Sequence, residues 1–379
     1  MSWLPLAGIK VADFSALLPG PFTTAILADL GADVVKVEPP RGDPARSLLP
    51  ALFHAVNRNK RSIALDLKSA EARAVIERLA RWADVVIESN RPGVAARIGI
   101  DYARLAALNP KLIYCSLSGY GQNGPWRDRP GHDIGYVGAS GGLSYPGSWM
   151  GKPVRSSIPI ADMQGGSFAV IAILAALHER NSTGTGAQLD LSLYEAGLFC
   201  AAMRHGIAEK PDPRAHLWPV NDLFETADGS PLILGIVEQH FWDNFLAAVK
   251  HLEPRLTDPK FDADAGRRAN GDELSFLLKA LFKKKTAREW HDMLEPLDVP
   301  AELPMTPFQA SNTDYARARG NAVDVDGERH VPFPLWANGA RGGKLSRGTP
   351  GLNADGEDVL KELGFSSSEI ARIIATAAV

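Results

Sequence analysis

Short apolar runs alternate with amphipathic stretches over the first 120 residues. Runs rich in β-branched residues predict strands over residues 9–14, 33–38, 62–67, 84–88 and 112–118. Between them, residues 22–30 and 70–82 have helical spacing. The apolar face of the second helix is formed by Ala72, Val75, Ile76 and Leu79. This alternation, with nearly continuous apolar strands, predicts an α/β fold on a doubly wound parallel sheet.

The hydrophobic pattern next predicts a helix over residues 163–179, a strand over 188–193 and a helix over 194–203. The pattern then changes at a proline-rich stretch, residues 211–219. Asp228-Gly229 between two apolar runs indicates a hairpin, and helical segments follow at 241–250, 272–281 and 287–294. The last residues, 366–377, are again helical in pattern.

These patterns predict two domains. The large α/β domain is discontinuous and takes residues 1–200 and 325–379. A smaller α+β domain takes residues 215–310, with linkers at 201–214 and 311–324.

Composition excludes several classes of protein. With 41 basic and 44 acidic side chains, the chain is too balanced for a nucleic-acid-binding surface. Its two cysteines, Cys115 and Cys200, lie in unrelated segments, which disfavours a disulfide framework and favours a reducing compartment. The longest uninterrupted apolar segment, residues 168–177, is half a membrane span, and the N-terminus lacks the pattern of a signal peptide. We therefore expect a cytoplasmic protein with no nucleic-acid partner and no membrane segment.

Several familiar catalytic patterns are weak. The nine histidines are scattered, so we expect no metal site. Residues 119–124 match the dinucleotide fingerprint Gly-Xaa-Gly-Xaa-Xaa-Gly, but Pro125 and Pro130 follow where a phosphate-binding helix should open. Residues 138–142 match the hydrolase elbow Gly-Xaa-Ser-Xaa-Gly, yet no strand precedes Ser140 and no helix follows it in the pattern. Neither motif has the structural context that its chemistry needs.

The more promising residues lie in the loops after the predicted strands, where open parallel sheets bind ligands. One such loop, residues 119–136, contains His132 in a Gly-His-Asp-Ile sequence. Asp162 precedes a predicted helix with Gly165 and Gly166 in its first turn, whose free N–H groups would stabilise a negatively charged oxygen. The alternatives are a structural histidine and a helix-capping aspartate. Together, the two side chains would suit proton abstraction next to a carbonyl.

Basic side chains gather around two of the predicted strands. They are Arg58, Lys60, Arg61, Lys68, Arg91 and Arg97. Two interpretations are open: ordinary surface charge, or a binding site for a phosphorylated carrier.

Nine segments of the chain occur in an order and spacing found together in one enzyme family. They are residues 8–14, 19–22, 30–38, 57–68, 91–94, 109–114, 119–125, 183–188 and 360–364. In these segments the chain resembles the class III CoA-transferase family, and within it the α-methylacyl-CoA racemase branch. The resemblance implies a Rossmann-like large domain and a small domain. It also implies two chains interlocked as a homodimer, with the active site between domains of different subunits.

The resemblance further implies the substrate and its contacts. Coenzyme A would enter as part of an acyl-CoA thioester, with no tightly bound cofactor. The positions that match CoA-binding residues of the family are Leu65, Asp66, Leu67, Lys68, Asn90, Arg91, Arg97, Gly131, Asp133, Ile134 and Tyr136. His132 matches the catalytic base of the racemase branch, Asp162 its partner, and Glu238 a glutamate near the site.

The reaction implied by the racemase branch inverts the α-carbon of a 2-methylacyl-CoA through an enolate. One of His132 and Asp162 removes the α-proton and the other returns a proton to the opposite face. In one direction Asp162 must start protonated, which requires a raised pKa.

Two alternatives remain. In a CoA-transferase, Asp162 would act as nucleophile and form a mixed anhydride with the acyl group. Two features argue against a transferase: Leu18 stands where oxalate-type transferases carry a glutamine, and their glycine-rich loop is not found between Phe224 and Phe241. His132 separately favours the racemase. The other alternative is an inactive acyl-CoA-binding relative, which the presence of both His132 and Asp162 disfavours.

Overall fold

The structure is a computed structural model that describes residues 3–377, and the chain forms two compact units. The larger unit comprises residues up to 140, 157–199 and those from 311 onward, and the smaller unit comprises residues 141–156 and 200–310. This division differs from the expected domains, because residues 141–156 and 201–214 belong to the smaller unit and 311–324 to the larger. Segment 141–156 is held there by Trp149, whose indole N–H donates to Asp272 at 2.9 Å and whose backbone N–H donates to Asp222 at 2.8 Å.

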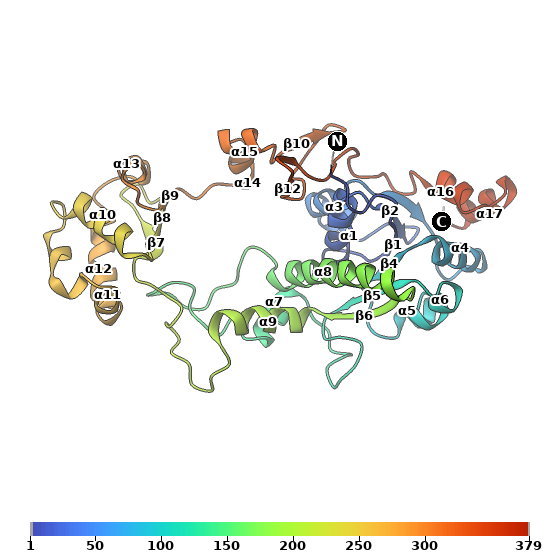
Figure 1. Cartoon of the computed structure of the whole chain (residues 1–379), viewed down its shortest axis with the longest axis horizontal. Coiled ribbons are helices and arrows are strands. Elements are labelled where there is room, and N and C mark those ends of the chain that lie inside the picture. The colour runs from blue at the N-terminus through green and yellow to red at the C-terminus, as the bar shows by residue number, and fades with distance from the viewer. Residues whose placement is uncertain (1–2, 378–379) are drawn as a thin grey trace. The chain divides into compact units, whose positions relative to one another are not determined.

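A six-stranded sheet in the order β3-β2-β1-β4-β5-β6 forms the centre of the larger unit, and all its neighbouring strands pair in parallel (Figure 1). Its strands are β1 (Lys10–Phe14), β2 (Asp33–Glu38), β3 (Arg61–Ala64), β4 (Val85–Glu88), β5 (Ile113–Ser118) and β6 (Ala187–Ser192). The predicted doubly wound parallel sheet is therefore confirmed. The strand order reverses between β1 and β4, and ligands of such sheets bind in the crevice beyond the carboxyl ends at this point.

Helices cover both faces of the sheet. The helices of the larger unit are α1 (Pro19–Asp29), α2 (Ala45–Leu48), α3 (Pro50–Asn57), α4 (Ala70–Trp82), α5 (Val94–Ile98), α6 (Tyr102–Leu108), α7 (Asp133–Ala139), α8 (Ile160–Thr183), α15 (Asp314–Arg319), α16 (Gly356–Glu362) and α17 (Ser367–Ala377). Two further helices, α9 (Leu193–His205) and α14 (Pro307–Ser311), continue from one unit into the other along the chain. Two short hairpins complete the unit: β10 (Val323–Val325) with β11 (Glu328–His330), and β12 (Trp336–Ala337) with β13 (Ala340–Arg341).

Alternate side chains of each strand enter two different cores. Ala12, Val35 and Val86 pack with α4, α6, α16 and α17 in one core, whereas Val11, Val34 and Val85 pack with α1 and α8 in the other. Burial of both faces explains why these strands are apolar throughout, since each buried apolar side chain contributes about 1.5–3 kcal/mol.

Helix α8 begins at Ile160, three residues before the predicted start. By length and composition alone it could cross a membrane; in this structure part of its surface is buried in the core with α1 and β5. Gly165 and Gly166 lie beyond its first turn and are buried. A side chain at Gly166 would meet the Phe22 ring and the Pro19 carbonyl, both at 2.8 Å, so this glycine allows α1 and α8 to approach closely.

The smaller unit has a three-stranded antiparallel sheet of β7 (Asn221–Glu225), β8 (Pro231–Gly235) and β9 (Ala301–Glu302). Its helices are α10 (Gln239–Val249), α11 (Asp264–Ala269), α12 (Gly271–Phe282) and α13 (Ala287–Leu294), with 3-10 turns at Pro254–Thr257, Pro259–Phe261 and Glu295–Leu297. Trp242 and Trp290 are fully buried in a core of its own.

Candidate active site

A cavity of about 330 Å³ lies in the larger unit beyond the carboxyl ends of β1, β4 and β5. It brings together six residues that the sequence predicted for the site: Asn90, Arg91, Gly131, His132, Tyr136 and Asp162. The other residues that line it are Ala16, Leu17, Pro19, Ser89, Pro92, Leu117, Ser118, Gly119, Arg127, Arg129, Pro130 and Leu193. The cavity lies at the point where the strand order reverses, as expected for this kind of sheet.

His132 precedes helix α7, although the sequence predicted a loop over residues 119–136. Its backbone is extended, and its carbonyl accepts the N–H groups of Gly135 at 2.8 Å and Tyr136 at 3.2 Å, while its side chain is exposed in the cavity wall. Gly131 lets the chain pass against the Tyr136 ring, with which any side chain at this position would collide. Burial, together with the negative charge of Asp162, raises the pKa of the Tyr136 hydroxyl to about 12.

Asp162 is the third residue of α8, and Asp133 caps this helix in its place. One oxygen of the Asp133 carboxylate accepts the N–H of Ala161 at 2.8 Å and that of Asp162 at 3.3 Å. Burial, together with the negative charge of Asp133, raises the pKa of Asp162 to about 7. Asp162 therefore has substantial protonated and ionised populations near neutral pH, which is the property that the two-base reaction requires of it.

The N–H groups expected to stabilise an enolate are not available. Those of Ala161 and Asp162 donate to Asp133, and that of Met163 donates to the Pro159 carbonyl at 3.1 Å. Because α8 starts earlier than predicted, Gly165 lies inside the helix and not in its first turn. The prediction of an anion site formed by the N–H groups from Met163 onward is therefore wrong.

Asn90 is fixed in the cavity wall by Glu88, the last residue of β4. Both the backbone N–H and the side-chain amide of Asn90 donate to one oxygen of Glu88, at 2.8 and 3.0 Å. Burial raises the pKa of the Glu88 carboxyl, although hydrogen bonds from Asn90 and Ser116 partly oppose the shift. The strand end thus sets the orientation of a cavity residue.

A second cavity, of about 230 Å³, shares Ala16 and Asn90 with the first. Its other lining residues are Phe14, Ser15, Val37, Glu38, Pro39, Asp43, Pro44, Leu67 and Ile98. The two cavities meet at the loops after β1 and β4, so an elongated ligand could occupy both.

The remaining predicted CoA-binding residues fall into three groups. Lys68, Arg97 and Ile134 are exposed outside both cavity linings, although Lys68 and Arg97 each adjoin a residue of the second cavity in sequence. Leu65 is buried in the core, and Asp66 accepts the Lys68 N–H at 3.0 Å. Asp133 is buried against the start of α8, as described above. Contact of these residues with CoA stays a prediction.

Three of the basic residues that suggested a carrier site pair with acids of the protein itself. Arg58 binds Asp29 at 2.6 Å and Lys60 binds Asp13 at 3.1 Å. Arg61 binds both Asp33 and Glu362 at 2.7 Å. Because these charges are compensated within the fold, the carrier interpretation is wrong for Arg58, Lys60 and Arg61.

Glu238 lies in the smaller unit, where it is exposed and directly precedes α10. Its catalytic role stays a prediction. Within residues 3–377, no group of three His, Cys, Asp or Glu side chains is arranged to hold a metal ion.

The two glycine motifs have structural roles. Ser140 is buried at the end of α7, where its hydroxyl donates to the Val137 carbonyl at 3.1 Å. In the dinucleotide-like segment, the Gln122 N–H donates to the Asp190 carboxylate at 2.9 Å. This segment continues as a loop through Pro125 and Pro130, as the prolines predicted.

Arg127 and Arg129 are cavity residues that the sequence analysis did not single out. They lie in the loop at residues 119–136, which the sequence predicted as part of the ligand site. The sequence therefore predicted the loop but not these two residues. Leu117, Ser118 and Leu193 were also missed, because strand ends and helix starts give no signal for which side chain faces a cavity.

A doubly wound sheet with a cavity where its strand order reverses is the arrangement in which α/β proteins bind ligands at the strand ends. The sequence profile of CoA-transferase family III matches residues 6–356. The chain belongs to this family, whose members act on CoA thioesters.

Curated relatives carry both kinds of activity in their names. The chain is 36% identical to an acyl-CoA transferase of Fusarium pseudograminearum, over 97% of this chain and 86% of that protein. It is 33% identical to acetyl-CoA:oxalate CoA-transferase of Acetobacter aceti, over 94% and 95% of the two chains. It is 30% identical to human alpha-methylacyl-CoA racemase, over 97% and 95%. Identity to these relatives does not separate racemase from transferase.

A solved structure of a CAIB/BAIF family protein from Brucella suis has the same architecture. It superposes with a TM-score of 0.82 at 31% identity and covers 95% of this chain and 99% of its own.

Proposed function

We propose that the protein is an acyl-CoA racemase that inverts the α-carbon of a 2-methylacyl-CoA by transferring protons between His132 and Asp162. The supporting observation is that both side chains line one cavity and that the pKa of Asp162 is raised to about 7. A two-base reaction needs a carboxyl that can start either protonated or ionised at neutral pH.

In one direction, neutral His132 takes the α-proton of the thioester, and the electron pair of the C–H bond moves into the thioester carbonyl to give an enolate. Protonated Asp162 then returns a proton to the opposite face of the α-carbon. In the other direction, Asp162 starts ionised and His132 starts protonated. Each turnover restores the total number of protons, so no acceptor acid is consumed.

A CoA-transferase is the alternative within the family, and the Acetobacter aceti relative acts on oxalate by name. In that reaction Asp162 attacks the thioester carbonyl as an ionised nucleophile. A raised pKa reduces the ionised fraction at neutral pH, which favours the proton-transfer role. Leu18, at the position where oxalate-type transferases carry a glutamine, is buried and supplies no polar group.

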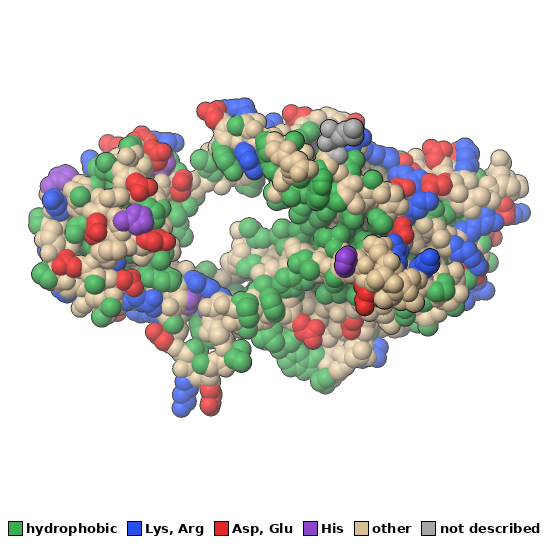
Figure 2. Space-filling view, in the orientation of Figure 1, with side chains coloured by type: hydrophobic (Ala, Val, Ile, Leu, Met, Phe, Trp, Pro, Cys, Tyr) green, Lys and Arg blue, Asp and Glu red, His purple; other side chains and the backbone are tan. Residues whose placement is uncertain are grey.

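The proposal also includes a homodimer and a cytoplasmic location. An apolar groove runs between α8, β6 and α9, and its residues Ile171 and Phe199 are more than half exposed; Figure 2 shows hydrophobic side chains over this region. Association of two chains would remove such a surface from water. Sedimentation of a monomer at micromolar concentration would contradict the dimer.

The deciding experiment is to incubate the protein with one epimer of 2-methylpentanoyl-CoA in deuterated water, without any acceptor acid. The racemase proposal predicts incorporation of deuterium at the α-carbon together with formation of the other epimer. A transferase requires an added acceptor acid, and hydroxylamine would trap its enzyme-bound acyl group. Absence of α-deuteration under conditions where the thioester binds would exclude the racemase.

A further inference from the structure

The loop after β1, residues 15–17, borders both cavities. Ala16 lines the two of them, Ser15 lines the second and Leu17 lines the first. Leu17 has a left-handed backbone with a φ of 64°. This conformation is disfavoured for every residue that carries a Cβ atom, because the Cβ approaches the following carbonyl oxygen. A leucine keeps it only where contacts with other parts of the fold impose it.

The contact that holds Leu17 comes from Asp43, which lies 26 positions further along the chain. Both oxygens of the Asp43 carboxylate accept the Leu17 N–H, each at 3.2 Å. Asp43 is 2% exposed, and its carboxylate also accepts the Ala45 N–H at 2.9 Å and binds the Lys36 Nζ at 2.9 Å. These further donors fix the carboxylate, so the Leu17 N–H has an acceptor in one defined position.

The other two residues of the loop are also held by side chains of other segments. Lys36 of β2 is fully buried, and its Nζ donates to the Ser15 carbonyl at 3.0 Å in addition to binding Asp43. The hydroxyl of Ser89, in the loop after β4, accepts the Ala16 N–H at 3.1 Å. The wall that the two cavities share is therefore placed by polar side chains from outside the loop.

Loss of the Asp43 carboxylate would remove the acceptor that favours the left-handed state of Leu17. The loop would then relax toward an ordinary backbone conformation, and the observed shape of the cavity wall would become a minor state. The apparent affinity of a ligand falls by the fraction of molecules that keep the binding-competent shape.

We propose that Asp43 is a positioning residue for the ligand site. Its carboxylate, held by Lys36, keeps Leu17 in the left-handed conformation and thereby keeps the loop after β1 in the shape that binds the ligand of both cavities. The inference rests on the proposed function for the ligand, a CoA thioester in these cavities, and does not require the proton transfer.

The test measures the affinity for 2-methylpentanoyl-CoA by calorimetry, with Asp43→Ala placed in three backgrounds at position 17. In the wild-type background, Asp43→Ala should weaken binding about tenfold, because the strain of a left-handed leucine is no longer compensated. In Leu17→Ala the side chain is short but the Cβ remains, so the loss should persist. In Leu17→Gly the left-handed conformation carries no Cβ penalty, so the loss should shrink to about twofold or less.

Comparing Asp43→Ala with its own background cancels any direct contact of the Leu17 side chain with the ligand. Asp43→Asn is the second variant, and it carries the test if Asp43→Ala does not fold. An asparagine keeps the size of the side chain but has one acceptor oxygen in place of two. It should therefore give a smaller loss with the same dependence on the residue at position 17.

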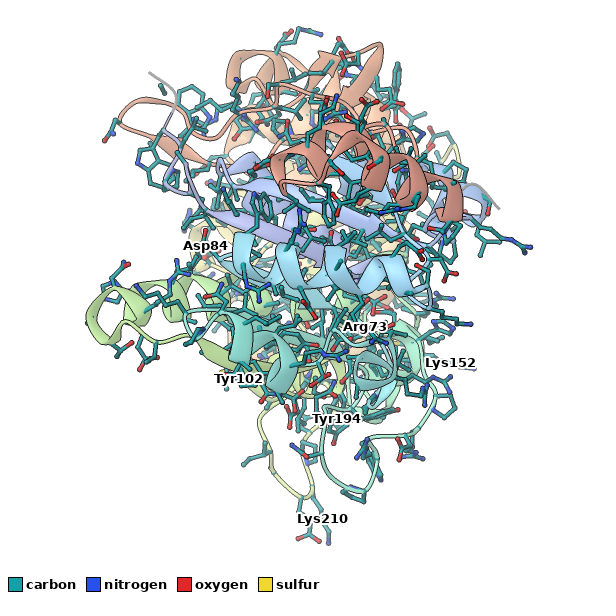
Figure 3. All side chains as sticks on the ribbon, turned by 90° about the vertical axis from the view of Figure 1, so that its right-hand side faces the viewer. Arg73, Asp84, Tyr102, Lys152, Tyr194 and Lys210 are labelled. Atoms are coloured by element: carbon teal, nitrogen blue, oxygen red, sulfur yellow. The ribbon has the colours of Figure 1, made fainter. Side chains whose placement is uncertain are left out.

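Asp84→Ala is the matched control. Asp84, which Figure 3 labels, also accepts a backbone N–H of β1, that of Lys10 at 2.9 Å, and pairs with Arg180 at 3.0 Å, but it lines neither cavity. Its removal should leave the affinity for 2-methylpentanoyl-CoA unchanged.

Two results would overturn the proposal. One is an unchanged affinity in Asp43→Ala, and the other is an equal loss in all three backgrounds, which would mean that Asp43 acts independently of the Leu17 backbone. Because binding is the readout, the expected dependence on position 17 without any α-deuteration would reject the racemase and keep the positioning role.

Discussion

Asp13 and Asp162 are two carboxyl groups of the larger unit that are at least partly buried. Their pKa values are shifted in opposite directions from the ordinary value of an aspartate. Burial alone would raise the pKa of Asp13, but Lys60 and Lys36, with hydrogen bonds from Ser15 and Thr24, lower it to about 2. Asp162 is also partly buried, but the charge that acts on it is another carboxylate, Asp133, and its pKa rises to about 7. Burial raises the pKa of both groups, so the opposite signs arise because the lysines and hydrogen-bond donors around Asp13 outweigh burial there.

The Asp13 region is a closed ionic network. Lys60 is fully buried, and its Nζ donates to Asp13 at 3.1 Å, to the Pro21 carbonyl at 3.0 Å and to Asn57 at 2.8 Å. Burial lowers the pKa of Lys60 to about 7, but three acceptors require the three N–H donors of an ammonium group, so the pair is ionic. Nothing in this network is left free to react. In contrast, Asp162 lines a cavity and its pKa is not lowered by any cation, which is typical of a functional site.

The largest expected effect is on activity. Asp162→Asn removes one of the two bases, and α-deuteration of a 2-methylacyl-CoA should slow by about 10²–10⁴-fold. His132→Gln should slow exchange from one epimer much more than from the other, because each epimer uses a different base. The measurement is the initial rate of deuterium uptake from each epimer. A similar, mild loss from both epimers in both variants would contradict the two-base scheme.

The next effect is on stability. Lys60→Met leaves the Asp13 carboxylate buried without its main partner and should lower the free energy of unfolding by about 3–5 kcal/mol. Lys361→Met is the matched control, because it removes an exposed pair with Glu357 and should leave stability nearly unchanged. Urea unfolding of the full chain measures both. Equal, small losses would show that the buried network is not important for stability.

A smaller effect concerns stability and pH. The folded-state pKa of Asp162 lies above its ordinary value of 3.8, so its contribution to stability is fully present below about pH 4 and is lost as the pH rises to about 7. Asp162→Asn should therefore be more stable than the wild type at pH 8, by about 1–2 kcal/mol, since exposure to the cavity reduces the full effect. Asp13→Asn should be less stable at pH 8, because the lowered pKa of Asp13 contributes stability that is lost only as the pH falls toward 2. Thermal unfolding at pH 5 and pH 8 compares the two, and a destabilised Asp162→Asn at pH 8 would argue against a raised pKa.

The smallest effect tests the connection between Asp133 and Asp162. Asp133→Asn retains an oxygen for the Ala161 N–H but removes the charge, so the loss of stability should stay below about 1 kcal/mol. The pKa of Asp162 should fall, and the limb of the pH–rate profile that reports this group should move to lower pH. An unchanged profile would mean that burial alone sets the pKa of Asp162.

Much of the fold follows from local patterns. The apolar runs predicted the strands of the parallel sheet, and the spacing of Val75, Ile76 and Leu79 predicted the buried face of α4, because side-chain periodicity is a property of neighbouring residues. The helix start at Ile160 was missed because its cap, Asp133, lies 28 positions away from Ala161 in the sequence. A cap supplied by another element has no local signature.

The candidate site was predicted in part for the same reason. His132, Asp162, Asn90 and Arg91 were predicted from the loops after the strands, where this class of sheet binds ligands. For the basic cluster the sequence left two interpretations open, because the partner of Arg61, Glu362, is 301 positions away. The sequence alone does not show which charged side chains form ion pairs, because their partners can be far away in the sequence.

The sequence by itself determined the order of strands and helices, the parallel sheet and the loops in which to seek the chemistry, since these depend on short-range periodicity and turn residues. Only the tertiary structure decided which charged side chains form ion pairs within the fold and which line the cavity. Asp13 and Lys60 meet as a buried pair, Asp133 raises the pKa of Asp162, and Arg129 lies stacked on Trp126 in the cavity wall. The physical reason is that the energy of a charge depends on its burial and on the charges beside it, and residues distant in the sequence supply both.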